Sequence, residues 1–250
     1  MHTFTIGADP EVFFTDGIRL VSAIGRIPGT KETPHNTPWG NIHADNVAAE
    51  FNIPAQSSKD GFDQAVKAGL DGVASYAKAC GLEVSADAFG PFSKEELSHP
   101  YALVGGCDPD FNAYTGTLNP KPFLEYFDER AAGGHVHIGT EITDSEVPHL
   151  VKVLDLFLGI PLLERENPDR RQLYGKAGSF RRKPYGLEYR TPSNAWIFSS
   201  NDRKWVYEAV DRALSEFKSI KLPENIPHVI DKHDLRMAQQ LMQDFRICPL

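Results

Sequence analysis

Polar and apolar residues alternate along four short stretches of the chain, which is the pattern of β-strands with one polar face. The stretches lie within residues 3–14, 46–53, 133–139 and 186–192. Each contains a polar–apolar–polar triplet: Asp9-Pro10-Glu11, Glu50-Phe51-Asn52, His135-Val136-His137 and Glu188-Tyr189-Arg190. Because alternate residues of a strand share a face, four strands of one sheet could gather these carboxylates, imidazoles and a guanidinium on one side.

The remaining patterns predict an α+β fold. Asp16-Gly17 predicts a turn into a second strand over 18–24, and the glycine and proline breakers of residues 25–45 predict a long loop near the site, one interpretation being a lid. Helical spacing of apolar residues predicts four helices, at about 60–81, 145–159, 202–219 and 233–245. We therefore expect a curved, mainly antiparallel β-sheet with helices packed on one face, in a single domain over residues 1–250.

Composition narrows the class of protein. The 250 residues are 41% hydrophobic and 24% charged, as in ordinary globular proteins. The net charge of −8 argues against a general affinity for nucleic-acid backbones or anionic membranes. No apolar run reaches bilayer length, and no signal peptide precedes the first strand pattern. The three cysteines are odd in number and widely spaced, so we expect reduced thiols in a cytoplasmic protein.

The acids and histidines of the triplets suggest a metal site. Two carboxylates on one strand face, Asp9 and Glu11, repel each other unless a cation lies between them, which favours a hard divalent metal. His-x-His at His135 and His137 also occurs in metal sites, without naming the metal. The alternatives are surface acids near a turn, an exposed Glu50, and half-buried histidines bonded to their neighbours.

Basic residues gather late in the chain, within fifteen positions: Lys176, Arg181, Arg182, Lys183 and Arg190. In a net-acidic protein this grouping suggests phosphate binding, because arginine gives bidentate and permanently charged contacts. The alternatives are a solvated basic turn and a simple ion-paired ladder of Glu188 with Arg190. The sequence has no P-loop and no dinucleotide fingerprint, so a nucleotide would be bound by metal and arginine on a sheet.

Taken together, the motifs resemble the glutamine synthetase and glutamate–cysteine ligase superfold, and within it the small phage-encoded carboxylate–amine ligases, or amidoligases. Residues 7–14, GADPEVFF, resemble the Gly-x-Glu-Pro-Glu-Phe-Phe strand of glutamine synthetases, with Asp9 where Glu is usual. Residues 47–54, VAAEFNIP, are similar to the Leu-Leu-Glu-Phe-Ile-Thr-Pro run of glutamate–cysteine ligases. Residues 133–137, GGHVH, resemble Gly-x-His-x-His, and residues 179–182 with 188–190 resemble the arginine segment and the last metal-binding Glu.

The resemblance implies a role for most of these residues. It implies two or three Mg²⁺ or Mn²⁺ ions, held by Asp9, Glu11, Glu50, His135 and Glu188. ATP would be contacted by His137, Lys176 and Arg181, while Arg190 and Arg182 (or Arg181 in its place) would be catalytic. Residues 106–112 and Arg130 look like features of the phage subgroup, and we expect substrate to be recognised by Asp108, Asp110 and Arg130.

The implied activity is an ATP-dependent joining of a carboxylate and an amine through an acyl phosphate, releasing ADP and phosphate. The carboxylate and the amine would be small molecules or peptide groups, and the protein would act in the host cytoplasm if it is phage-encoded. Members of the superfold often self-associate, which leaves a homo-oligomer open. Three other functions remain: a guanidino-kinase-like phosphotransferase, a His-x-His metallohydrolase, and a non-catalytic structural or interaction protein.

Overall fold

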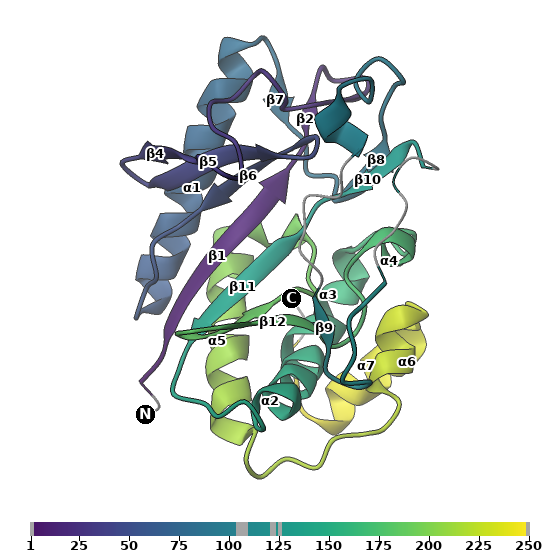
Figure 1. The fold of residues 1–250 in the computed structure, drawn as a ribbon. Coiled ribbons are helices and arrows are strands. Elements are labelled where there is room, and N and C mark those ends of the chain that lie inside the picture. Colours follow the sequence, from purple (N-terminus) through teal and green to yellow (C-terminus); the bar gives the residue numbers. More distant parts are fainter. Residues whose placement is uncertain (1–2, 104–109, 121–123, 125–126, 249–250) are drawn as a thin grey trace.

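The fold is built on one antiparallel sheet (Figure 1). The structure, a computed structural model, describes residues 3–103, 110–120, 124 and 127–248. The sheet has eight strands in the order β4-β5-β6-β1-β11-β13-β12-β9. In chain order these strands are β1 Thr5–Val12, β4 His35–Thr37, β5 Gly40–Asp45, β6 Ala48–Asn52, β9 Phe111–Asn112, β11 Gly134–Gly139, β12 Ser179–Lys183 and β13 Gly186–Tyr189.

Two smaller sheets and a short 3-10 helix lie near the end of the main sheet where β1 leads into β2 (Figure 1). One pairs β8 with β10, and the other has the order β3-β2-β7. Their bounds are β2 Phe14–Thr15, β3 Leu20–Val21, β7 Glu83–Val84, β8 Phe89–Pro91 and β10 Glu129–Ala131, with η1 at Pro100–Leu103. A satellite apolar cluster that includes Phe13 and Phe92 supports this region.

The longer helices pack behind the main sheet (Figure 1). They are α1 Lys59–Ala79, α2 Val147–Leu154, α5 Ser200–Glu216 and α7 Leu235–Asp244, with shorter elements η3 Asp155–Gly159, α3 Ile160–Leu162, η4 Leu163–Arg165, α4 Arg170–Leu173, η5 Asn194–Ile197 and α6 Ile226–Asp231. Helix α1 lies so close to β6 that a Cβ on Gly69 would come within 2.5 Å of the Phe51 ring. Glycine therefore fixes the distance between this helix and the sheet.

Apolar side chains from the strands fill the space beneath these helices. Ile6, Phe51, Val136 and Leu187 are completely buried in one large cluster with residues of α2 and α5. Burial of each such side chain contributes roughly 1.5–3 kcal/mol. Because residues alternate along a strand, this packing turns the polar members of the four triplets to the opposite face of the sheet.

The predicted α+β layout, with an antiparallel sheet and helices, is confirmed. The predicted long loop over residues 25–45 is wrong in its second half, because β4 and β5 form a hairpin there that extends the sheet. Gly40, at a φ of +144°, begins β5, so this breaker serves the hairpin instead of a loop. The predicted strand over 18–24 shortens to β3. Among the described residues, no helix combines the length and the apolar character needed to cross a bilayer.

Candidate active site

The register of the sheet places the predicted acids and histidines beside one another on its polar face. Neighbouring strands set them in directly opposed pairs: Asp9 with His135, Glu11 with Glu50, and His137 with Glu188. Opposed residues of antiparallel strands have Cβ atoms about 4.5–5.5 Å apart. Five of the six side chains are buried, and His137 is half-buried. The structure therefore brings together residues that are up to 180 positions apart in the sequence.

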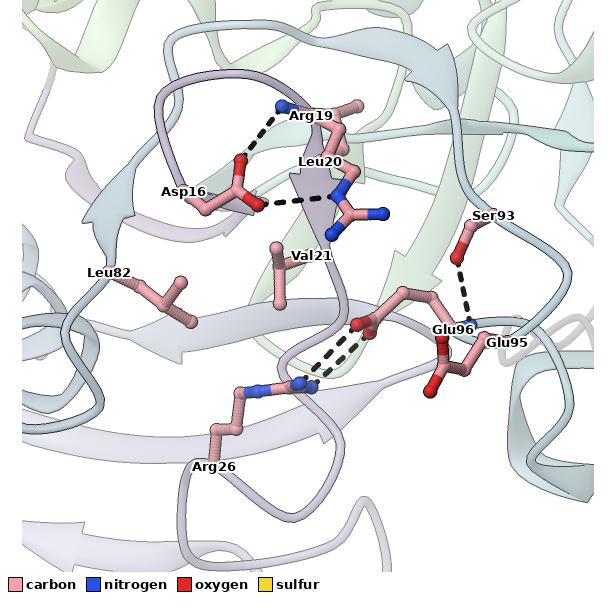
Figure 2. Close-up of a pocket in the computed structure, with 9 residues that line it drawn as sticks. All are labelled: Asp16, Arg19, Leu20, Val21, Arg26, Leu82, Ser93, Glu95 and Glu96. Carbon is pink, nitrogen blue, oxygen red and sulfur yellow. Dashed lines mark hydrogen bonds and ion pairs between the residues drawn. The ribbon is translucent and has the colours of Figure 1, made fainter.

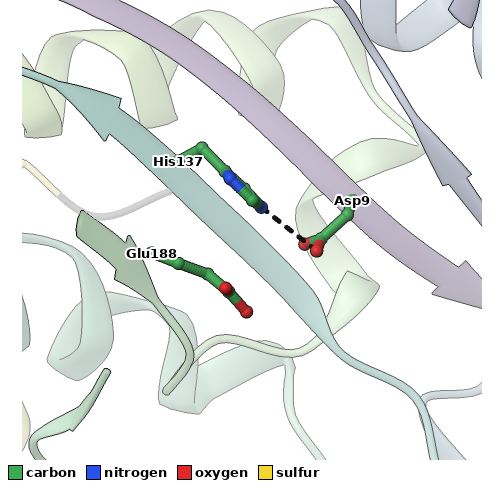
Figure 3. Close-up of side chains that lie close together, drawn as sticks. All are labelled: Asp9, His137 and Glu188. Atoms are coloured by element: carbon green, nitrogen blue, oxygen red, sulfur yellow. Dashed lines mark ion pairs between the residues drawn. The ribbon is translucent and has the colours of Figure 1, made fainter. Parts of the chain in front are cut away.

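The first cluster consists of Asp9, His137 and Glu188 (Figure 3). Each offers one atom that could bind a metal, and these three atoms lie within 4.8 Å of one another. Asp9 bridges both histidines, with its Oδ2 at 3.1 Å from His137 Nε2 and its Oδ1 at 3.1 Å from His135 Nδ1. Burial favours a neutral carboxyl, but His137 and His135 overcome it and hold the pKa of Asp9 well below its usual value.

His135 is a neutral imidazole next to the first cluster. Burial, followed by the nearby Arg190, lowers the pKa of His135 to about 3. Its Nε2 is buried and has no hydrogen-bond partner among the described residues. A Cβ on Gly133 would collide with this ring, so glycine at that position makes room for it. A buried lone pair without a donor suits a metal ligand, which the sequence had predicted for this residue.

The second cluster consists of Glu11, Asp45 and Glu50, whose carboxylate oxygens also lie within 4.8 Å of one another. Burial, and then the negative charge of Asp45, raise the pKa of Glu11 to about 7. The N–H of Gly133 donates a hydrogen bond of 2.7 Å to Glu11, which favours the ionised carboxylate and offsets part of this rise in pKa. Three buried acids at such distances are stabilised by a cation, and their oxygens are the ligands that Mg²⁺ and Mn²⁺ accept.

Sequence reasoning missed Asp45, a member of the second cluster, and His43, which lies beside that cluster. Both lie on β5, where the loop had been predicted. His43 is buried, with its Nε2 at 3.6 Å from Glu50 Oε1, and neither ring nitrogen has a hydrogen-bond partner among the described residues. The signal was present in the sequence, because Ile42 and Ala44 alternate with His43 and Asp45 in the manner of a half-buried strand.

Glu188, a member of the first cluster, is also surrounded by positively charged side chains. Glu188 forms ion pairs with Arg190, with Arg181 Nη1 at 3.4 Å and with Lys183 Nζ at 2.8 Å. Burial and the negative charge of Asp9 nevertheless raise the pKa of the Glu188 carboxyl above its usual value. Three positive groups thus lie directly beside the carboxylates, an arrangement suited to phosphate oxygens.

Arg190 is held from several sides and is almost fully buried. Its Nε lies 3.6 Å from Asp110 Oδ2, and its guanidinium lies over the Tyr174 ring at 5.3 Å from the ring centre. The same ring contacts His135 at 5.7 Å between ring centres. Asp110, a predicted substrate-binding residue, is therefore adjacent to the predicted catalytic arginine.

The structure does not bring every predicted residue to this face. Arg182 lies on the opposite side of β12 from Arg181 and Lys183, because residues of a strand alternate. Its Nε lies 2.7 Å from Asp144 Oδ1, and its Nη2 donates to the carbonyl of Ile142 at 3.0 Å. These partners occupy Arg182 in holding the 140–146 connection.

The remaining predicted residues have other surroundings. Arg130 is buried on β10, where its Nη2 donates to the Ala102 carbonyl at 2.9 Å and its Nε donates to Asn46 Oδ1 at 3.2 Å. Lys176 lies in the loop before β12, and its carbonyl accepts a hydrogen bond from Thr191 Oγ1. Asp108 lies outside the described residues.

A pocket beside β3 is separate from the predicted site (Figure 2). Four of its charged residues form two pairs: Arg26 Nη1 lies 3.2 Å from Glu96 Oε2, and Arg19 Nε lies 3.3 Å from Asp16 Oδ2. None of the predicted site residues that the structure describes lines it. The polar face of the main sheet is therefore the candidate active site.

Buried carboxylates, imidazoles and guanidinium groups on one face of an antiparallel sheet define a site of the metal- and phosphate-binding class. Comparison with known proteins makes this more specific: residues 121–225 match the family described as phage phiEco32-like COOH.NH2 ligase-type 2. The match confirms the predicted resemblance to phage carboxylate–amine ligases over this segment, and that family is described as one of ligases that join a carboxylate to an amine. The matched segment carries β11, β12 and β13 but none of β1, β5 or β6. No curated protein matches the chain.

Proposed function

We propose that the protein is an ATP-dependent carboxylate–amine ligase that works through an acyl phosphate, on a catalytic domain of the glutamine synthetase type. The family match supports C–N bond formation. The observation that carries the ATP-dependent part is the placement of Arg181, Lys183 and Arg190 directly beside Glu188 on a face rich in carboxylates. A carboxylate does not react with an amine at neutral pH, because hydroxide is a poor leaving group, so a phosphoryl donor has to activate it.

Two divalent cations, Mg²⁺ or Mn²⁺, fit the two clusters. In the second cluster, burial and the charge of Asp45 raise the pKa of Glu11 although Lys31 Nζ lies 3.8 Å from Asp45 Oδ2. Beside the first cluster, His135 Nε2 is a buried lone pair without a hydrogen-bond partner among the described residues. Asp9, His135, His137 and Glu188 would hold one ion, and Glu11, Asp45 and Glu50 the other. Bound ions of this kind neutralise the phosphate oxygens of ATP and orient the triphosphate.

The basic residues of β12 and β13 act on the phosphoryl group that is transferred. An oxygen of the substrate carboxylate attacks the γ-phosphorus, the bond from that phosphorus to the β–γ bridging oxygen breaks, and ADP leaves. Arg190, Arg181 and Lys183 stabilise the negative charge on the equatorial oxygens during this step. Arg190 is positioned for it by Tyr174 and Asp110, so little reorganisation is needed when the charge develops.

The amine completes the reaction. Its nitrogen attacks the acyl carbon, the bond from that carbon to the bridging oxygen breaks, and phosphate leaves. Asp110, whose Oδ2 lies 3.6 Å from Arg190 Nε, binds the incoming amine and accepts the proton that it loses.

Product analysis tests this function. The purified protein is incubated with ATP, Mg²⁺ and a mixed pool of carboxylates and amines, and the products are identified by mass spectrometry. We expect ADP and a new amide in equal amounts, lost in Glu188→Gln and retained in Asp144→Asn, whose carboxylate is exposed and lies outside the clusters.

Three outcomes would contradict the proposal. A stable phosphorylated amine without an amide would indicate a guanidino-kinase-like phosphotransferase. An amide formed at the same rate without ATP, or ATP turnover that survives Glu188→Gln, would show that the polar face does not carry the reaction.

A further inference from the structure

An acid that the proposed reaction does not use lies behind the sheet. Asp155 begins the π-helical turn η3, between the apolar helices α2 and α3, and is completely buried. The N–H of Ile160 donates to the Asp155 carbonyl, the five-residue step of a π-helix. Such turns are frequent at functional sites. Asp155 is the single charged residue of η3 and α3, and its immediate helical neighbours, Leu154 and Leu156, are fully buried.

The Asp155 carboxylate binds both residues that flank Arg190. Tyr189 Oη donates to Asp155 Oδ1 at 2.6 Å, and Thr191 Oγ1 donates to the same oxygen at 3.2 Å. The other oxygen, Oδ2, accepts from the N–H of Gly178 at 2.7 Å. Gly178 immediately precedes β12, the strand of Arg181 and Lys183. One carboxylate therefore links both segments that carry the phosphate-binding cations.

The local packing is fitted to this contact. A Cβ on Gly159 would lie 2.6 Å from Tyr189 Oη, so glycine at the end of η3 lets the tyrosine reach Asp155. Burial raises the pKa of Asp155 to about 7, which means that the ionised acid is costly at this position. An apolar residue would avoid that cost. The packing of the core therefore does not explain why an acid occupies position 155, which points to a role for its hydrogen bonds.

We infer that Asp155 is a positioning residue, which fixes the backbone on both sides of Arg190 and the start of β12 so that the cations meet the transferring phosphoryl group. This role rests on the proposed function. A displacement of about 1 Å at a reacting group can cost about 100-fold in rate, so small movements of Arg190 are sufficient.

The test uses Asp155→Asn, in which an amide N–H₂ replaces one carboxylate oxygen and cannot accept from Gly178. Asp231→Asn is the matched control, because Asp231 Oδ1 accepts from the N–H of Ala177 at 2.8 Å and so holds the same loop without contacting Tyr189 or Thr191. Each variant is assayed for kcat and KM of ADP formation. The crystal structure of Asp155→Asn reports the position of the Arg190 guanidinium.

We expect Asp155→Asn to lower kcat by about tenfold or more with a smaller change in KM for ATP, and Asp231→Asn to leave kcat near the wild-type value. In an Arg190→Lys background, Asp155→Asn should lower kcat little further, since the group that it positions is already altered. The crystal structure of the single variant Asp155→Asn should show the Arg190 guanidinium displaced from Glu188. Tyr189→Phe, which removes one hydroxyl, replaces Asp155→Asn in every measurement if the latter does not fold.

An unmoved Arg190 in the crystal structure would overturn the inference, as would an equal loss of kcat in Asp231→Asn. Failure of the proposed function looks different. In that case the wild-type protein forms no ADP with any pool of substrates, and the crystallographic comparison still decides whether Asp155 positions Arg190.

Discussion

Glu11 and Glu50 lie directly opposite each other across β1 and β6, both buried. Like charges in this relationship destabilise a sheet. We predict that Glu50→Gln makes the metal-free protein more stable than the wild type, because one of the opposed charges is removed. We also predict that Mn²⁺ or Mg²⁺ stabilises the wild type, by about 2.7 kcal/mol at 100 times its Kd, and that Glu50→Gln loses most of this gain.

Thermal unfolding with EDTA and with added metal measures both effects. Asp144→Asn is the control and should respond to metal as the wild type does, because its carboxylate is exposed. A metal-free Glu50→Gln protein that is clearly less stable than the wild type would mean that Glu50 is held by other contacts and not for a cation.

The two arginines that were both predicted to be catalytic should behave differently. Arg190→Lys keeps the charge but loses the planar fork that binds phosphate, so we expect kcat for ADP formation to fall by about 100-fold. Arg182→Lys should leave kcat nearly unchanged, because Arg182 is bound to Asp144 on the other side of β12. Steady-state kinetics of both variants check this, and equal losses of kcat would show that the reaction does not depend on Arg190 more than on Arg182.

Tyr185 should support metal binding through His137. The Tyr185 hydroxyl and His137 Nδ1 form a hydrogen bond, and the two rings stack at 6.0 Å between centres. The bond orients the imidazole so that Nε2 points to Asp9. We predict that Tyr185→Phe weakens Mn²⁺ binding by about 10- to 100-fold in isothermal titration calorimetry with a nonhydrolysable ATP analogue present.

Tyr207→Phe is the control for that measurement. Tyr207 lies on α5, one of the helices behind the sheet, and its hydroxyl donates to the exposed Ser57 carbonyl. Wild-type affinity in Tyr185→Phe would exclude an orienting role for the hydroxyl and leave the aromatic ring as the relevant part of the residue.

The stability of the fold should depend on pH through Asp155. Burial raises its pKa from the ordinary value near 3.8 to about 7, so the folded protein binds a proton that the unfolded chain releases. The resulting stability is complete below about pH 4 and is lost as the pH rises to about 7. The slope is at most about 1.4 kcal/mol per pH unit.

Asp155→Asn removes this titration. We therefore predict that the free energy of unfolding of the wild type, minus that of Asp155→Asn, decreases between pH 5 and pH 7 and becomes constant above pH 8. Urea denaturation at four pH values measures the difference. A difference that rises with pH would mean that the hydrogen bonds from Tyr189 and Gly178 outweigh burial and keep the acid ionised.

Strand alternation predicted much of the site. It correctly placed His135 and His137 on one face, and Glu50 with its apolar neighbours beneath, because burial on one side of a sheet enforces a period of two. The same rule, applied to residues 179–183, would have separated Arg182 from Arg181. The basic residues of this segment suggest phosphate binding from their charge alone, and only the structure shows the segment paired with β13 as a strand.

Other features depend on contacts between distant segments. The two histidines look alike in sequence, yet burial beside Arg190 lowers the pKa of His135 while Asp9 raises that of His137. Asp155 lies in an apolar helical pattern, which gives no sign that Tyr189 will meet it from another element. Asp45 and His43 were missed because the breakers of residues 25–45 outweighed a short alternating pattern.

The seam between β1 and β11 has a consequence for how the molecule assembles. Strands β1, β5 and β6 lie within residues 5–52, whereas β11, β12 and β13 lie within residues 134–189. Asp9 and His135, which meet across β1 and β11, are 126 positions apart in the sequence. Closing so large a loop is slow, and neither half alone carries all three residues of the first cluster. The ability to bind ligand should therefore arise in the last stage of folding, when β1 pairs with β11. Newly made chains should bind ligand only after synthesis has passed β13.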